Sequence, residues 1–356
     1  MSYRTGSMAL RKPPPQDGQL ELFSAVFTDI VTRDIQDAME VPFLSLSKKP
    51  RVAPIIYSGK GIEITVTGGA PYGIANIWDW DLIMWLLSQV REAIDKGQAV
   101  SRQVRFHRHA FLKSARRDAG GIQYKRLEDT IARLKNTNVV TTIRSSERQT
   151  VMFSWLEYVH IDRDDHGRLR DVTVVLPEWL FEAVRDRSLI LSLHPDYFLL
   201  TGGIERWLYR FIRKQAGNSA QGWKWRLETL YERSGSSQRP SDFATAIRDI
   251  AKHGKLLDYE LQIQKTNSQE LLFARKEGTS AKAIPETIPL PQAQFLCLKT
   301  TTYEKAKKIA PGYDIYSLED DWRQMTKKND IVLKDPDAAF LAWCRKVAQK
   351  PVRVAR

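Results

Sequence analysis

Lysine and arginine side chains are concentrated in one stretch of this 356-residue chain. Residues 102–148 contain twelve lysines and arginines but only four aspartates and glutamates. Guanidinium and ammonium groups bind phosphate oxygens through charge-assisted hydrogen bonds, and a basic region of this kind is typical of nucleic-acid-binding proteins. The whole chain has a net charge of +13 and a pI near 9.6, which also favours a polyanionic partner. These basic residues therefore predict that the chain binds the phosphate groups of a nucleic acid.

Three helices and a β-hairpin are expected to position these basic residues. Apolar spacing predicts a helix that Asp79 caps and that ends by Gly97, a second helix over 107–116 and a third over 122–135. Strands over 138–144 and 149–160 should follow, because both segments are rich in β-branched and aromatic residues. This order is that of a winged helix.

The third helix should present a polar face to DNA. Leu127, Ile131 and Leu134 recur at i, i+4 and i+7, which predicts the side that faces the core, and leaves Thr130 on the outward side with the basic residues. From this helix and the wing after it, the residues predicted to contact DNA are Gln123, Lys125, Arg126, Arg133, Arg144 and Arg148.

The same order of elements recurs about 120 residues later, which indicates an internal duplication. A helix over 204–214, whose polar side holds the four basic residues Arg206, Arg210, Arg213 and Lys214, precedes a strand over 223–226 and a helix over 227–233. Pro240 then begins a further helix, and two alternating strands form a second wing. The residues predicted to contact DNA from this repeat are Gln238, Arg239, Ser241, Thr245, Arg248 and Lys252.

These patterns predict an α+β protein with two tandem winged-helix domains, an N-terminal β extension and a small C-terminal helical region. We expect a flexible tail over 1–40, the first winged-helix domain with its N-terminal strands over 41–186, the second over 187–280, and a linker with short helices over 281–356. A tandem pair could contact two successive major grooves without dimerising.

Several other protein classes are disfavoured. No apolar run approaches the roughly 20 residues of a membrane span, and no signal-peptide core is present, so a cytoplasmic protein is expected. Cys297 and Cys344 are too few for a zinc site or a disulfide scaffold, and we predict no metal or cofactor. A nucleotide-binding loop is also excluded, because Pro54 stands where its first glycine would be needed before the Gly59-Lys60 pair.

A nicking enzyme is the first rival interpretation. His107-Arg108-His109 is the nearest approach to the His-apolar-His metal pair of rolling-circle nickases. Arginine occupies the position that should be apolar, and no carboxylate cluster is near in sequence. We therefore expect a binding protein and not an enzyme.

Three segments resemble the plasmid replication initiators of the replication initiator protein A type. They are Met39–Lys48, Ile77–Asp81 and Asp335–Phe340, and the resemblance covers most of the chain from Gln19 onward. It implies a tandem winged-helix initiator that binds repeated sites in double-stranded origin DNA, helps to open the duplex and recruits host proteins such as the replicative helicase. It also implies a homodimer that represses its own promoter. A winged-helix transcriptional repressor without an initiation role remains an alternative.

A short N-terminal segment suggests a further partner. Gln19, Leu20, Glu21, Leu22 and Phe23 resemble the Gln-Leu-x-Leu-Phe peptide by which polymerase subunits and some initiators dock on the bacterial sliding clamp. A leucine and a phenylalanine can fill an apolar cleft. Two alternatives stay open: these residues begin a helix that packs on the first domain, or Phe23 stacks on single-stranded DNA of the opened origin.

Overall fold

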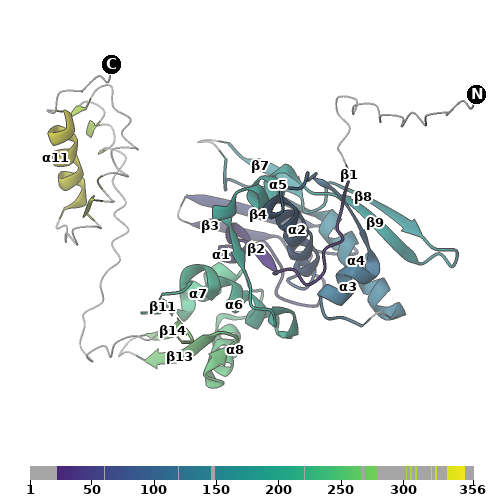
Figure 1. The fold of residues 1–356 in the computed structure, drawn as a ribbon. Helices are drawn as coiled ribbons and strands as arrows, with labels where there is room; N and C mark the ends of the chain where they lie inside the picture. Colours follow the sequence, from purple (N-terminus) through teal and green to yellow (C-terminus); the bar gives the residue numbers. More distant parts are fainter. Residues whose placement is uncertain are drawn as a thin grey trace, which may run out of the picture. The chain divides into compact units, whose positions relative to one another are not determined.

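The chain folds as a mixed α and β structure, shown in Figure 1 as a computed structural model, and its contacts divide it into two compact units, Met1–Ala281 and Lys282–Arg356. The first unit is described over residues 22–59, 61–118, 120–145, 149–219, 221–265 and 269–278. The second is described at residues 302, 305–306, 309–310, 322, 325–326 and 335–348.

Helix α2, Trp80–Asp95, is the central helix of the first unit. Every residue from Trp80 to Arg91 is buried, as expected for a helix that is apolar on most of its circumference. Even Gln89 is buried, and its amide group exchanges two hydrogen bonds with the backbone of Phe27 at 2.9 and 2.8 Å. Gly97 follows the helix in the left-handed conformation, with φ +69°, so α2 begins and ends where the sequence predicts.

The strands of the first repeat belong to two separate four-stranded sheets. In one, the order is β3-β4-β6-β7, and Val66 lies opposite Val139 where β4 meets the antiparallel β6. In the other, the order is β1-β5-β9-β8. The strands are β3 Ile55–Gly59, β4 Ile62–Gly68, β6 Thr137–Thr141, β7 Val151–Ser154, β1 Leu22–Ser24, β5 Gln103–His107, β9 Leu169–Val175 and β8 Tyr158–Arg163.

The helices of the first repeat are α3 Arg108–Ser114, α4 Gly121–Asn136 and α5 Glu178–Arg185. Helix α4 buries Leu127, Ile131 and Leu134, which confirms its predicted core side. The single wing strand predicted over 149–160 is wrong. The segment forms the end of one sheet and the start of another because the buried residues Trp155 and Leu156 separate β7 from β8.

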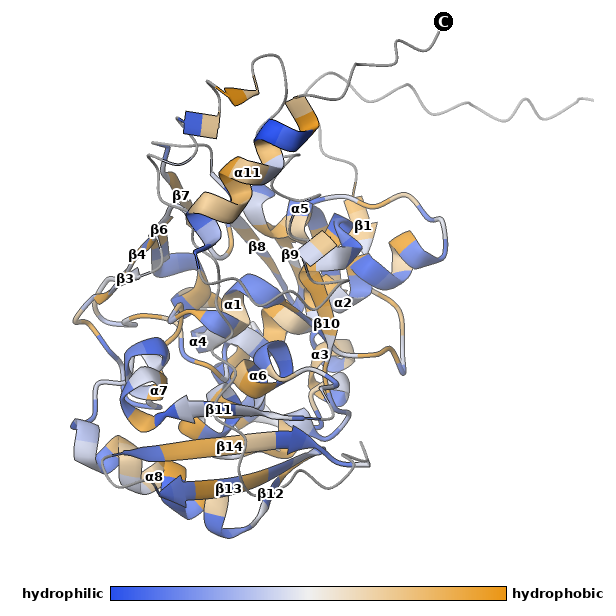
Figure 2. Cartoon of the chain, turned by 90° about the vertical axis from the view of Figure 1, so that its left-hand side faces the viewer, coloured by the Kyte–Doolittle hydropathy of each residue, from blue (hydrophilic) through white to orange (hydrophobic). Residues whose placement is uncertain are grey.

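The second repeat gathers its strands into one sheet of order β11-β14-β13-β12, with α8 lying beside it (Figure 2). Helix α8 buries Phe243, Ile247 and Ala251. The elements are α6 Gly203–Gln215, β11 Trp223–Arg226, α7 Leu227–Ser234, α8 Pro240–Lys252, β12 Lys255–Leu256, β13 Tyr259–Lys265 and β14 Glu270–Lys276. Both repeats thus share the order helix, strand, helix, helix, strand, strand. Their strands pair differently, because those of the first repeat are divided between two sheets and those of the second lie in one.

The prediction of a flexible tail over 1–40 is wrong for residues 22–40. Strand β1 pairs in parallel with β5, and strand β2, Arg33–Ile35, pairs antiparallel with β10, Ile190–Ser192. Helix α1, Gln36–Glu40, packs against α6. These residues are held by burial of side chains such as Phe23, Ile35 and Met39 in the same core as α2.

In the second unit, helix α11, Pro336–Ala348, packs Phe340 and Cys344 against Trp322. Most of the rest of 281–356, where a linker and further short helices are predicted, lies outside the described residues. None of the described helices combines the length and the apolar character that crossing a membrane requires.

Candidate nucleic-acid interface

The beginning of α8 presents polar side chains to solvent. Pro240 occupies the first turn, where its missing N–H breaks no intrahelical hydrogen bond. Immediately before it, the side chain of Arg239 is 85% exposed, and among the described residues its one ion-pair partner is the exposed Asp242, at 3.4 Å. Gln238 and Ser241 are exposed as well. The structure therefore places these three predicted residues together, free to meet a ligand.

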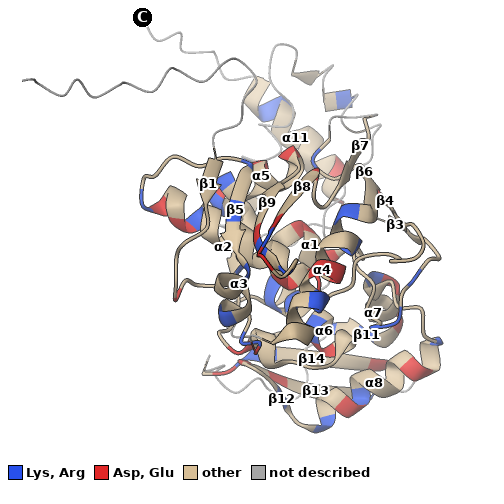
Figure 3. Cartoon of the chain, turned by 90° about the vertical axis from the view of Figure 1, so that its right-hand side faces the viewer, with Lys and Arg blue, Asp and Glu red and all other residues tan. Residues whose placement is uncertain are grey.

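Further along α8, the residues predicted to contact DNA form hydrogen bonds with neighbouring residues at the protein surface. Both Nε and Nη2 of Arg248 donate to Oε2 of Glu270 on β14, at 2.9 and 2.7 Å. The Thr245 hydroxyl donates to the carbonyl oxygen of Ser241 at 3.0 Å. Lys252 donates to Asp249 at 2.6 Å. Figure 3 shows residues of both charge signs along α8, so its surface is mixed in charge.

Helix α4 directs its polar side chains in two directions. The Lys125 side chain points to solvent and is 75% exposed. Arg133, in contrast, binds the carboxylate of Asp79 through Nε and Nη2, both at 2.7 Å, and Asp79 is 1% exposed. Thr130 is buried and donates to the same carboxylate at 2.7 Å. The expectation that Arg133 and Thr130 face outward is therefore wrong.

Asp79 has a different role from the helix cap that its position suggests. It stands at the N-cap of α2 but makes no capping hydrogen bond, because its side chain accepts from Arg133, Thr130 and the backbone N–H of Asn76. The hydrogen bonds that Arg133 donates to Asp79 raise the pKa of Arg133. The carboxylate therefore fixes α4 against the start of α2.

Asp81 forms a second buried anion, two residues later. It accepts from Arg117 at 2.6 Å and from Arg206 on α6 at 2.7 Å. Burial raises the pKa of Asp81, and the two guanidinium groups act in the opposite direction. Asp81 thus joins the end of α3 to the start of the second repeat.

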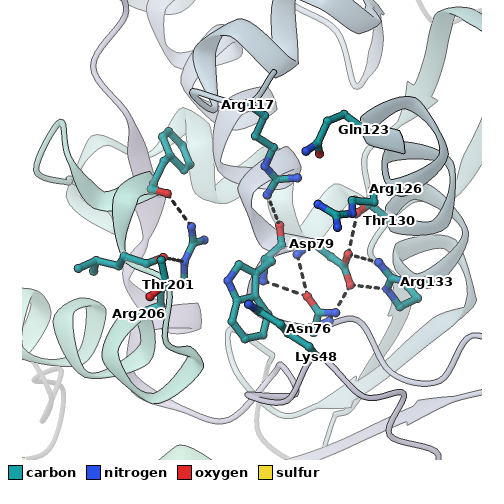
Figure 4. Close-up of a pocket in the computed structure, with 13 residues that line it drawn as sticks. Lys48, Asn76, Asp79, Arg117, Gln123, Arg126, Thr130, Arg133, Thr201 and Arg206 are labelled. Carbon is teal, nitrogen blue, oxygen red and sulfur yellow. Dashed lines mark hydrogen bonds and ion pairs between the residues drawn. The ribbon is translucent and has the colours of Figure 1, made fainter. Parts of the chain in front are cut away.

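Several polar side chains of the first repeat line a cavity of about 490 Å³. Figure 4 shows Arg126 and Arg206 on opposite sides of this space, with Arg117 and Lys48 at its other two sides. Gln123 and Arg126, both predicted to contact DNA, line the cavity together with Arg133. Its full lining is Lys48, Asn76, Trp78, Asp79, Arg117, Gln123, Arg126, Thr130, Arg133, Phe198, Leu200, Thr201 and Arg206.

Arg144 does not extend from a wing tip as predicted. Its side chain is only 20% exposed, pairs with Asp37 of α1 at 2.9 Å and lies 3.8 Å from the ring centroid of Trp179. These contacts fix the guanidinium group against the protein. Arg148 lies outside the described residues.

The clamp-like segment is partly built into the fold. Phe23 is 8% exposed in β1, opposite Val104 of β5, whereas Leu22 is 50% exposed. The alternative that this segment begins a helix is wrong, because residues 22–24 form a strand. Gln19, Leu20 and Glu21 lie outside the described residues.

The His107-Arg108-His109 segment lies in contact with the side chain of Tyr124. The hydroxyl of Tyr124 lies 3.1 Å from Nε2 of His109, and the rings of His107 and His109 stack at 5.4 Å. Burial lowers the pKa of His107. Within the described part of the chain, no three histidine, cysteine or acidic side chains are grouped to hold a metal ion.

The amphipathic pattern of α6 predicts its arginines on a polar outer face, and this prediction is wrong for Arg206 and Arg210, which are 3% and 1% exposed. Nε of Arg210 donates to Asp34 of β2 at 2.6 Å, and the same carboxylate accepts from the Trp80 indole at 2.9 Å. The signal that could have revealed one of these pairs is Asp81 near the start of an apolar helix, because a buried carboxylate needs a partner. Asp34 follows Thr32 and Arg33 and gives no such signal.

Comparisons with known proteins agree with this architecture. Residues 33–261 match the family model of replication initiator protein A. A protein of Wigglesworthia glossinidia brevipalpis named "Putative replication protein" is 28% identical over 231 residues, which are 63% of this chain and 82% of the relative.

Among solved structures, one crystal structure of domains 2 and 3 of RctB superposes with a TM-score of 0.52 at 12% identity and covers 67% of this chain and 98% of that chain. A second structure of RctB domains 2–3 gives a TM-score of 0.45 at 11% identity, with 65% and 94% covered. The first of these likenesses indicates a shared mixed α and β fold.

Proposed function

Because the chain belongs to the replication initiator protein A family, we propose that it recognises repeated sites in double-stranded DNA at a plasmid origin through two tandem winged-helix repeats. The observation that carries this proposal is the exposed start of α8, where Gln238, Arg239 and Ser241 stand together on the solvent side of a helix. Arginine and glutamine side chains at the start of a recognition helix can form bidentate contacts with base edges in the major groove.

The two repeats have different parts in this proposal. Helix α8 supplies the base contacts through Arg239 and Arg248, with Thr245 and Lys252 next to them. The first repeat supplies a phosphate contact through Lys125, an α4 residue that is predicted to contact DNA and whose side chain is 75% exposed. The repeats form one compact unit joined through buried ion pairs, so the spacing of their contacts on DNA would be fixed.

Replacing Arg239 or Arg248 by alanine tests the proposal. Fluorescence anisotropy should compare an origin repeat with a scrambled duplex at one stated salt concentration. Each lost bidentate contact should reduce the discrimination between the two duplexes by about 1–3 kcal/mol, roughly 5- to 150-fold. Arg170→Ala is the matched control, because Arg170 is 52% exposed on β9 and, in the part of the chain that the structure describes, pairs with its neighbour Asp171 alone.

Unchanged discrimination in both α8 variants would refute the assignment of α8. The initiation role is tested separately, by asking whether each variant supports autonomous replication of a plasmid that carries the origin. A protein that retains promoter repression but never supports replication would be a repressor instead.

Opening of the origin, recruitment of the host helicase and clamp, and formation of a homodimer are further proposals that rest on family membership. For the clamp, Phe23 imposes a physical condition. Its side chain is buried and β1 is paired with β5, so docking through Leu22 and Phe23 would require β1 to separate from the sheet.

A further inference from the structure

The cavity between α4 and the start of α6 has the size and charge of a ligand site. Its volume of about 490 Å³ lies within the range of small-molecule pockets. One wall comes from α4 of the first repeat and the opposite wall from residues 198–206 before and within α6 (Figure 4). A ligand bound here would contact both repeats at once.

The floor of the cavity consists of fixed guanidinium groups. Arg133 is held by Asp79, and Arg117 and Arg206 are both held by Asp81. These ion pairs leave the side chains little freedom, so little further conformational entropy is lost when an anion binds. The floor of the cavity therefore holds three positive charges and two buried carboxylates.

The mouth of the cavity is positive as well. Lys48 and Arg126 are both exposed, and neither has an acidic partner among the described residues. Lys48 lies over the ring of Trp78, with Nζ 5.0 Å from its centroid. Together with the floor, five positive side chains oppose the carboxylates of Asp79 and Asp81. The excess of three positive charges would be offset by a small polyanion.

We propose that this cavity binds two neighbouring phosphate groups of a nucleotide, with Arg126 and Lys48 as the groups that attract and hold them. The phosphates would come either from a free nucleoside polyphosphate or from successive phosphodiesters of a single DNA strand. A duplex is too wide to enter a space of this volume. The inference does not require α8 to contact DNA, and it assigns Arg126 to the cavity and not to the major groove.

The test compares the full-length protein with the double variant Lys48→Ala/Arg126→Ala. Isothermal titration calorimetry at low salt should use three probes: sodium tripolyphosphate, ADP and a short oligothymidylate. Wild type should bind at least one probe with one-to-one stoichiometry, and the double variant should bind it about tenfold more weakly or worse, since two charge-assisted contacts are lost. Lys135→Ala is the control, because Lys135 is an exposed residue of α4 that does not line the cavity.

Both removed side chains lack acidic partners, so the double variant should keep the wild-type circular dichroism spectrum and melting temperature. Binding of ADP or tripolyphosphate without the oligonucleotide identifies a free nucleotide as the source, and binding of the oligonucleotide alone identifies a DNA strand. The proposal is overturned if no probe binds at millimolar concentration, or if the folded double variant binds as well as wild type. Duplex discrimination measured on the same variant separates this outcome from a failure of the α8 proposal.

Discussion

Helices α4 and α8 occupy the same place in the two repeats, yet their polar faces have different surroundings. On α4, Arg133 is held by a carboxylate that is 1% exposed. On α8, Arg248 is held by Glu270 in a pair whose side chains are 40% and 25% exposed, and Arg239 is 85% exposed. Part of the polar face of α4 is thus tied to a buried carboxylate, whereas the polar face of α8 lies at the surface of the unit.

The cause of this difference lies outside the two helices. In the second repeat, β11, β13 and β14 form a single sheet, and α8 packs on that sheet with its other side in solvent. In the first repeat, β5 belongs to a different sheet from β6 and β7, and residues 198–206 of the second repeat lie across the cavity from α4. The order of elements is repeated, but their environment is not.

The largest effect is expected from removing the buried ion pair that joins the two repeats. Asp34→Ala would remove the carboxylate that pairs with the guanidinium of Arg210 and accepts from the indole N–H of Trp80 in the core. Removing one partner of a buried ion pair costs about 3–5 kcal/mol, so the free energy of unfolding in urea should fall by that amount. The loss should appear for both repeats in one transition, since they share a single core.

Asp249→Ala is the control for this prediction. Asp249 and Lys252 form a pair on α8 whose side chains are 56% and 74% exposed. Exposed pairs contribute about 0–1 kcal/mol, so this variant should unfold almost as wild type does. Equal effects of the two substitutions would mean that the Asp34 pair does not hold the repeats together.

The sequence predicted the repeated elements well, because each depends on local spacing. Leu127, Ile131 and Leu134 identified the core side of α4, and Pro240 identified the start of α8. Helical periodicity tells which side of a helix is apolar. It does not tell whether a neighbouring segment covers the other side.

The candidate site was predicted less well, because helical periodicity does not reveal which segments cover the polar side of a helix. Arg133 and Arg206 look like solvent-facing cations in a basic chain, and only the fold brings Asp79 and Asp81 against them. Lys48 lies about 80 residues from Arg126 in sequence, and no local pattern joins them. The Trp78-Asp79-Trp80-Asp81 segment carried part of the family resemblance, and its two carboxylates hold the cavity arginines.

A smaller effect is expected from the solvent-facing side of α4. Lys125→Ala should reduce the log–log slope of duplex affinity against salt concentration by about one unit, because one phosphate contact is lost. The preferred DNA sequence should stay the same, in contrast to Arg239→Ala on α8. A variant that kept the salt slope but changed the sequence preference would show that α4, and not α8, contacts the bases.

The smallest effect concerns the exposed ion pair of α8. Hydrogen bonds from Arg248, and then from Lys265, hold the pKa of Glu270 below its ordinary value of 4.5. A carboxyl whose pKa is lower in the folded state adds stability above the unfolded pKa, and that stability is lost as the pH falls through the folded pKa. Glu270→Gln removes this titration. The melting temperature of wild type should therefore slightly exceed that of the variant at neutral pH, and the two should converge as the pH falls below 4.5. A constant difference across this range would show that the Glu270 carboxylate does not stabilise the fold through its charge, and that Arg248 is held on α8 by other contacts.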